Sequence, residues 1–442
     1  MKKILILLSL SLLFTPIFAT GAQDGEDAPK VFEIAIQATK DNQIEALTKI
    51  FNGIVDRYNA ENGTNYELLI LSDQGKDLIN TRMSSNDKPD IFHLDSPADA
   101  TQYANDGLLL NLTDASKQYG WEDKLFNWAF DLAKVGGEVY TLPYGYEGMV
   151  LWYNKEVMTD LGLNADDIDT FAEYEDALQK AQDNGYIPVM LGTQDWPWAQ
   201  EWYLSTMFSY TSREAVKSAI EGVTKWNTPA FKKTVELYKS WHDKKFLADG
   251  KSYILTSDDA INAFTSGKAL FKLEGTWAPY WIVPLEKADQ DKIGVMLHPA
   301  INDVEKPHMP LALGGMWAAS ADTKYPELAA YIISSMLDQD IQGIYLKNGL
   351  DIAPMVVDKS LFDELIPVAQ NMWGIVNDAL ANGDFGYTTW AFYPPETRMY
   401  LYEEIVNVLE GNISIDDYLN EMDRLTTEEL ATGFIPVVPS SK

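Results

Sequence analysis

The stretch Gly136–Lys155, GGEVYTLPYGYEGMVLWYNK, places aromatic rings beside a carboxylate. Tyr144, Tyr146 and Glu147 lie just before the apolar run Met149–Tyr153, which is typical of a buried strand. Aromatic rings offer flat apolar faces and a carboxylate accepts hydrogen bonds, so this set suits a polar ligand that also has apolar faces. The alternative is a hairpin whose tyrosines pack in a core and whose Glu147 is solvated. Taken alone, the stretch leaves both interpretations open.

A second aromatic group follows the predicted short strand 187–191. Trp196 and Trp198 flank Pro197 in a polar loop. Proline fixes its own φ angle and stiffens the loop, which could hold the two rings as a platform for a ligand. The alternative is that both rings cover a helix.

Signatures of catalysis and of metal binding are missing from the sequence. None of the four histidines has the helical zinc-protease spacing, and no nucleophile elbow, phosphate-binding loop or dinucleotide fingerprint occurs. The absence of cysteine excludes thiolate nucleophiles and disulfides. Among the 66 acidic residues, local context picks out no carboxylate pair suited to glycoside hydrolysis. We therefore expect no catalytic residue, no metal and no cofactor.

The N-terminal part of the chain has the pattern of a parallel α/β sheet. Hydrophobic periodicity predicts strands at 31–36, 66–71 and 90–94, separated by helices that end near residues 63 and 83. Ligands of such sheets bind at the carboxyl ends of the strands. This position selects Gln37, Asp41 and Asp95, although Asp95 could instead cap the helix that follows it.

Composition limits the possible architectures and partners. The chain has 442 residues, which is too long for one ordinary core and predicts two or more domains. The formal net charge of −32 argues against nucleic acid and anionic membrane surfaces as partners, since both require basic patches.

The N-terminus has the features of a cleavable export signal. A basic Lys2-Lys3 pair precedes the apolar run 4–14, and small residues lie at 19–22. The apolar run is too short to span a bilayer, although an N-terminal membrane anchor is the alternative. Without cysteine the chain cannot be lipidated there. We expect a signal peptide at residues 1–22 and a mature protein in the periplasm, with secretion to the medium as the alternative.

Several stretches together resemble the extracellular solute-binding proteins of family 1, which include the maltose-type sugar receptors of ABC importers. They keep the family's order along nearly the whole mature chain. They are GEVYTLPYGYEGMVLWYNKEVMTDLGL (137–163), AFTSGKALFKLEGTW (263–277), residues 310–330 with their Gly-Gly strand, LEGNISIDDYLNEM (409–422), and PDIF (89–92) with GLL (107–109).

The resemblance implies an α/β, two-lobed periplasmic-binding-protein fold of the type II-like kind. Each lobe would be a mostly parallel sheet flanked by helices, and a multi-strand hinge would join the lobes. It implies an N-terminal lobe at 31–147 plus about 314–345, and a C-terminal lobe at 148–313 plus about 346–442. The ligand would lie in the cleft between the lobes.

By the same resemblance, Glu147 corresponds to a hinge carboxylate that receives sugar hydroxyls, and Trp277 to an aromatic stacking residue. Glu274 lies just before Trp277 in that motif. The ligand-binding residues that we predict are Gln37, Asp41, Asp95, Tyr144, Tyr146, Glu147, Trp196, Trp198, Glu274, Trp277, Gly315, Trp317, Trp373, Trp390 and Arg398.

The function that this implies is a non-enzymatic receptor that delivers a carbohydrate to the permease subunits of an ABC importer, as a monomer. A polyol phosphate would favour basic cleft residues such as Arg398 and Lys40. A polyamine would favour several carboxylates between aromatic rings. A secreted carbohydrate-active enzyme and a structural surface protein are the rivals from other classes.

Overall fold

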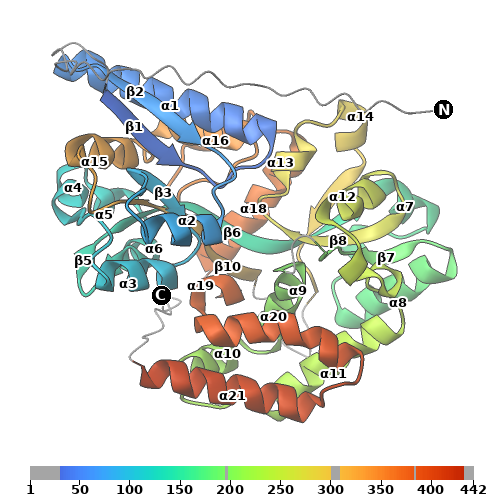
Figure 1. The fold of residues 1–442 in the computed structure, drawn as a ribbon. Coiled ribbons are helices and arrows are strands. Elements are labelled where there is room, and N and C mark those ends of the chain that lie inside the picture. Colours follow the sequence, from blue (N-terminus) through green and yellow to red (C-terminus); the bar gives the residue numbers. More distant parts are fainter. Residues whose placement is uncertain (1–29, 195–197, 300–308, 383–384, 433–442) are drawn as a thin grey trace, which may run out of the picture.

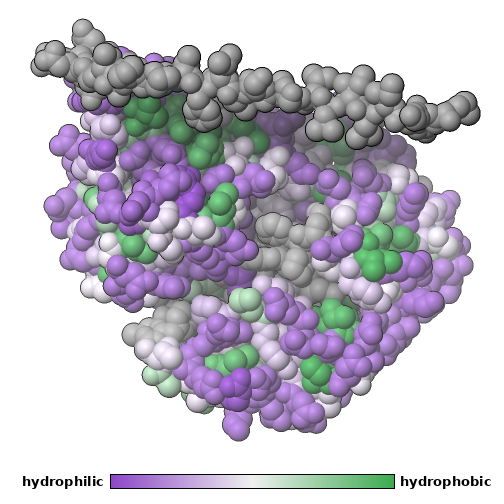
Figure 2. All heavy atoms as spheres, in the orientation of Figure 1, coloured by the Kyte–Doolittle hydropathy of each residue, from purple (hydrophilic) through white to green (hydrophobic). Residues whose placement is uncertain are grey.

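The fold was examined in a computed structural model, which describes residues 30–194, 198–299, 309–382 and 385–432. Two lobes face each other, one around β1 to β3 and the other around β7 and β8, and a strand running between them joins them (Figure 1). Hydrophilic side chains dominate the face drawn in Figure 2, as the net charge of −32 leads one to expect. Within these ranges, no helix has both the length and the apolar character required to cross a bilayer.

The strands have the following bounds: β1 (Lys30–Ala35), β2 (Tyr66–Leu71), β3 (Ile91–Leu94), β4 (Lys134–Val135), β5 (Glu138–Val139), β6 (Thr141–Asn154), β7 (Ile187–Met190), β8 (Ala269–Gly275), β9 (Ile293–Met296), β10 (Met309–Ala319) and β11 (Phe385–Tyr387). The α-helices are α1 (Asp41–Asn62), α2 (Lys76–Met83), α3 (Pro97–Asn105), α4 (Thr113–Gln118), α5 (Trp121–Lys124), α6 (Asn127–Leu132), α7 (Lys155–Asp160), α8 (Phe171–Asp183), α9 (Trp198–Thr211), α10 (Arg213–Ile220), α11 (Pro229–Asp243), α12 (Ser257–Thr265), α13 (Pro279–Ile282), α14 (Lys287–Gln290), α15 (Pro326–Ser335), α16 (Gln339–Lys347), α17 (Lys359–Phe362), α18 (Pro367–Asn382), α19 (Thr389–Phe392), α20 (Pro395–Leu409) and α21 (Ile415–Ala431).

The N-terminal lobe follows from the predicted strand–helix alternation. β2, β1 and β3 pair in parallel, and α1 buries Leu47, Ile50 and Phe51 from one face. Gly63 ends α1 in the left-handed conformation (φ 64°) and donates its backbone N–H to Asn59 O, an arrangement that glycine adopts without strain. The parallel order brings the ends of β1, β2 and β3 to one edge, where polar loops follow each strand.

β6 and β10 are the two strands that cross between the lobes. Residues 141–148 of β6 pair with residues 311–318 of β10, and β10 also pairs with β3. Farther along, β6 pairs with β8 and β9, while β10 pairs with β11. Because both crossing strands run antiparallel to most of their neighbours, the sheet is mixed (Figure 1). The sequence predicted a strand only from Met149 onward, whereas β6 continues unbroken back to Thr141.

A third connection lies after α16. This helix packs on α1, and the segment beyond it still contacts the N-terminal lobe: Tyr146 N donates to Ile352 O (2.9 Å), and Phe126 N donates to Pro354 O (2.8 Å). Helix α18 then packs on β9 of the other lobe. Residues 352 and 354, which the resemblance assigned to the C-terminal lobe, thus contact the N-terminal lobe.

Candidate functional site

A cleft of about 810 Å3 lies between the lobes, and both lobes and the crossing strands line it. The N-terminal lobe contributes the loops that follow β1, β2 and β3. The crossing strands contribute residues from the middle of β6 and β10, and the C-terminal lobe contributes residues from α9, α12, α19, α20 and the segment after β8. The carboxyl ends of the parallel strands thus open on the cleft, as expected for a sheet of this kind.

Eight of the predicted binding residues line this cleft: Gln37, Asp95, Tyr144, Glu147, Trp277, Trp317, Trp390 and Arg398. They come from seven different strands, helices or loops, and the tertiary fold brings them together.

Among the predicted residues whose side chains the structure describes, Asp41, Tyr146, Glu274, Gly315 and Trp373 do not line the cleft. Tyr146 (1 % exposed) packs edge to face on Trp373, with ring centroids 5.3 Å apart, so both rings belong to the core. Glu274 is equally buried and forms an ion pair with Lys272 at 3.0 Å inside the C-terminal lobe.

Two further predicted residues, Asp41 and Gly315, are not part of the cleft lining. Asp41 begins α1 and is exposed. Gly315 lies behind the wall, because a Cβ there would come within 2.5 Å of His93 Cε1 and 2.6 Å of Tyr144 Oη. Its role is therefore to leave room for these two side chains.

Trp196 lies outside the described residues, and Trp198 is the first residue of α9.

Irregular pairing of β6 with β10 explains which hinge residues point into the cleft. The register passes from Leu313 opposite Tyr146 to Gly315 opposite Gly145, and then to Met316 opposite Pro143. It therefore skips Gly314 on β10 and Tyr144 on β6, and both skipped residues line the cleft. A bulge of this kind re-aims side chains that strict alternation would place on the other face.

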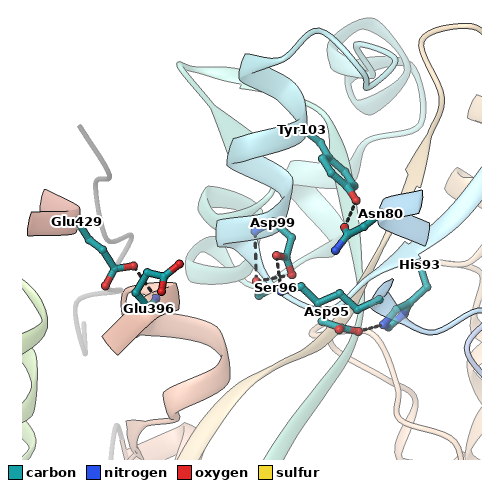
Figure 3. A network of polar contacts seen from close by, with 9 residues as sticks. Asn80, His93, Asp95, Ser96, Asp99, Tyr103, Glu396 and Glu429 are labelled. Atoms are coloured by element: carbon teal, nitrogen blue, oxygen red, sulfur yellow. Dashed lines mark hydrogen bonds and ion pairs between the residues drawn. The ribbon is translucent and has the colours of Figure 1, made fainter. Parts of the chain in front are cut away.

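A series of polar contacts runs from Asp95 into the hinge. His93 Nε2 lies 2.6 Å from Asp95 Oδ1 (Figure 3). His93 Nδ1 lies 2.7 Å from the Tyr144 hydroxyl oxygen. Ser96, and not Asp95, caps α3 by accepting a hydrogen bond from Asp99 N, which leaves the Asp95 carboxylate facing the cleft.

The surroundings of Asp95 and Tyr144 determine their protonation. Burial acts to raise the pKa of Asp95, but the hydrogen bond and charge of His93, with Arg398 and Lys76, outweigh it and hold that pKa below its ordinary value. Burial, reinforced by Tyr345, raises the pKa of Tyr144 well above its ordinary value. At neutral pH the cleft thus presents an ionised Asp95 and a neutral tyrosine.

Glu147 and Asp351 form a second, different pair of acids. Burial, and next the charge of Asp351, raises the pKa of Glu147 well above its ordinary value. Burial also raises the pKa of Asp351 to about 7, although a hydrogen bond with Thr276 opposes this rise. At neutral pH the two carboxyls therefore offer both a hydrogen-bond donor and an acceptor.

Aromatic rings form the remaining walls of the cleft. Tyr144 lies beside Trp317 with ring centroids 4.9 Å apart, and Trp277 lies between Trp202 (5.0 Å) and Trp390 (6.1 Å). Such rings offer flat apolar faces together with N–H and O–H groups at their edges.

The lobes touch at the mouth of the cleft. Lys40 Nζ forms an ion pair with Asp258 Oδ1 at 3.0 Å, and Asn42 Nδ2 donates to Tyr280 O at 3.2 Å. Lys40 and Asn42 belong to the N-terminal lobe, whereas Asp258 and Tyr280 belong to the C-terminal lobe. These two contacts therefore bridge the lobes.

The sequence did not single out several lining residues, notably Trp202, Tyr345 and Asp351. Trp202 follows Trp198 by one helical turn in an aromatic-rich segment, which is a weak signal. Asp351 follows the helix-ending pair Asn348-Gly349, and nothing in its local sequence marks it as a cleft residue.

The arrangement suits non-covalent binding of a polar ligand with apolar faces. Within the described ranges, no group of three or more His, Asp or Glu side chains is placed to hold a metal ion.

Comparison with known proteins agrees with this geometry. The family model for bacterial extracellular solute-binding proteins matches residues 42–342. A solved structure described as a chitin oligosaccharide binding protein superposes with a TM-score of 0.78 at 22 % identity, covering 91 % of this chain and 99 % of that one. It confirms the predicted two-lobed α/β fold.

Curated relatives match over shorter stretches. An uncharacterized ABC transporter extracellular-binding protein of Pyrococcus horikoshii is 22 % identical over 46 % of this chain and 45 % of its own length. The xylose/arabinose-binding protein XacG of Haloferax volcanii is 26 % identical over 39 % of this chain and 37 % of its own length. The chain thus matches less than half the length of either relative. The family match, which covers more than half of the chain, confirms the resemblance that the sequence suggested: this chain belongs to the bacterial extracellular solute-binding proteins.

Proposed function

We propose that this protein is a periplasmic receptor that captures a carbohydrate in the interlobe cleft and delivers it to the permease subunits of an ABC importer. The observation that carries the proposal is the pairing of aromatic walls with carboxyl groups in one cleft. Sugar rings present C–H faces that stack on Trp277 and hydroxyls that bond to groups such as Asp95 and Glu147. Closure over the ligand would present the permease with a distinct shape.

The names of two similar proteins support the same ligand class. One is named for xylose and arabinose and another for chitin oligosaccharides. The family itself is one of solute-binding proteins, so we expect no turnover. The predicted signal peptide at residues 1–22 lies outside the described residues. Together with the family's extracellular character, that signal supports a periplasmic receptor. We propose in addition that the receptor is not lipidated, since the chain has no cysteine, and that it acts as a monomer.

A polyol phosphate fits the cleft less well than a sugar. Of the basic residues that line it, Lys40 is paired with Asp258 and Lys76 with Asp99 (2.8 Å). Arg398 faces the carboxylates of the cleft, where it lowers the pKa of Asp95. Little positive charge is therefore left for a phosphate.

The test is a thermal-shift and calorimetric screen of the mature protein against mono-, di- and oligosaccharides, polyols and polyamines. A sugar present at about a hundred times its dissociation constant should add about 2.7 kcal/mol of stability. Absence of any sugar response from ligand-free, folded protein would overturn the proposal. Sustained release of reducing ends from an oligosaccharide would replace it with an enzyme.

A further inference from the structure

The interior of the cleft holds more acidic than basic side chains. Asp95, Glu147 and Asp351 are its inner carboxyl groups, and Arg398, 5 % exposed, is the buried cation among the described lining residues. His93 and Arg398 both act on Asp95. Arg398 also acts on Glu147, so this one buried cation is shared among the inner carboxyl groups.

The fold makes room for both acids of this pair. A Cβ at position 314 would come within 2.6 Å of Glu147 Oε2, and a Cβ at position 145 would come within 3.0 Å of Asp351 Cβ. Gly314 and Gly145 therefore let the two carboxyls approach the hinge strands closely. Asp351 Oδ1 is shielded from solvent and has no hydrogen-bond partner in the part of the chain that the structure describes. A buried acceptor in this state is costly unless a ligand supplies a donor.

Aromatic rings of the same cleft suit a cation. Tyr144 and Trp317 line it from the crossing strands, and Trp277 and Trp390 line it from the C-terminal lobe. The face of an aromatic ring attracts an ammonium group, and it does so more strongly where water is excluded.

We propose, on the basis of the receptor function proposed above, that Glu147 and Asp351 select a sugar that carries a protonated amino group. A neutral hydroxyl brings no positive charge to these carboxyl groups, so they keep their proton. An ammonium group has three donors and one positive charge, so it satisfies Asp351 Oδ1 and balances the pair at the same time.

The protonation of Glu147 and Asp351 is compatible with replacement of their proton by an ammonium group. Burial and the mutual repulsion of the two carboxyls favour keeping a proton on the pair while the cleft is empty. The other groups that act on Glu147 are Trp390, Asp95 and Arg398. When an ammonium group binds, the proton is released to solvent and the positive charge of the ammonium group stabilises the ionised carboxyl.

The experiment compares matched ligands by calorimetry on the mature protein. Glucosamine, galactosamine and their β-1,4 oligomers carry a free amine, and their N-acetylated and hydroxyl counterparts of equal length lack it. The amine form should bind about 30-fold more tightly than both counterparts near pH 7.5. Equal or tighter binding of a neutral counterpart overturns this inference and leaves the receptor function standing. Binding of spermidine without any sugar, or no binding at all, overturns both.

A charge-removing variant tests which residue is responsible. Asp351→Asn keeps the side-chain volume and should reduce the preference for the amine to about threefold or less. Asp106→Asn, which removes one charge from the exposed end of α3, should leave the preference intact. An undiminished preference in folded Asp351→Asn overturns the assignment.

A measurement on the unaltered protein keeps the test independent of variant folding. The pair must lose its proton to hold an ammonium group, so the amine-to-hydroxyl affinity ratio should rise as the pH rises from about 5 to about 7. A ratio that is flat or falls over this range overturns the inference.

Discussion

The two lobes line the cleft with different chemistry. The N-terminal lobe and the crossing strands contribute linked titratable groups, namely the chain from Asp95 through His93 to Tyr144, and the acids Glu147 and Asp351. The C-terminal lobe contributes mainly rings, with Trp277 between Trp202 and Trp390.

This difference suggests a division of labour. Polar groups held by a sheet and a hinge keep their geometry whether the cleft is open or closed, so they suit recognition of particular hydroxyl or amino groups. Rings on the opposing lobe gain apolar contact with the ligand only when the lobes close, so they suit stabilisation of the closed state. Substitutions on the two sides should therefore differ in kind.

The largest loss is expected on the polar side. Glu147→Leu removes a hydrogen-bonding group at the hinge and should weaken ligand binding by at least about 100-fold. Because it also removes a buried acid, the folded protein should be as stable as before or more stable. Titration calorimetry and thermal melts check both parts. Glu67→Gln, an exposed position on β2, is the control and should change neither. Full affinity in Glu147→Leu would show that the hinge acid does not contact ligand.

An intermediate loss is expected on the aromatic side. Trp277→Ala should weaken binding by about 30-fold through loss of stacking area, and Trp277→Phe should recover most of the affinity because it keeps a flat face. Stopped-flow measurements should locate the change in the dissociation rate. If Trp277→Ala unfolds the protein while its folded fraction binds normally, the ring is core, and the division between the lobes fails on that side.

A smaller effect is expected at the mouth. Asp258→Asn breaks the ion pair that Asp258 forms with Lys40 of the other lobe. The side chain of Lys40 is 42 % exposed and that of Asp258 is 64 % exposed. Exposed pairs contribute at most about 1 kcal/mol, so affinity should fall by no more than about fivefold and the effect should shrink in high salt. Asp249→Asn breaks an exposed pair with Lys251 within one lobe and serves as the control. Equal effects of both variants would mean that the contact does not hold the lobes together.

The smallest effect is on the pH dependence of the ligand-free protein. The pKa of Asp351 is raised from its ordinary value to about 7 by burial, so the folded state holds a proton that the unfolded state releases. Stability from this group is present at low pH and is lost as the pH rises from about 4 to about 7. The melting temperature of Asp351→Asn relative to the unaltered protein should therefore rise across this window and level off above it. A constant difference would show that Asp351 titrates normally.

Sequence periodicity was sufficient for the elements that form locally. The bounds of β2 and the end of α2 match the prediction, and α1 ends before Gly63 as its glycine indicated. The reason is that period, capping and turn residues act within a few positions of each other. Cleft residues near strand ends, such as Gln37 and Asp95, were predictable for the same reason, since a parallel sheet brings strand ends together.

Residues whose direction depends on distant partners were not predictable in this way. Tyr146 and Glu274 have suitable side chains, yet the first packs on Trp373 and the second pairs with Lys272. Asp351 lies in the site because the residues after it are held in place by backbone hydrogen bonds: Ile352 O accepts from Tyr146 N of β6, and Pro354 O accepts from Phe126 N.

The sequence by itself determined the family, the α/β class and the presence of an acid and a tryptophan at the two motif positions, Glu147 and Trp277. Only the tertiary structure decided which faces of β6 and β10 line the cleft, because that follows from a bulged register between strands about 170 residues apart. The tertiary structure also brought Asp351 close to Glu147. The protonation of that pair depends on burial and on mutual repulsion, and neither can be read from the local sequence.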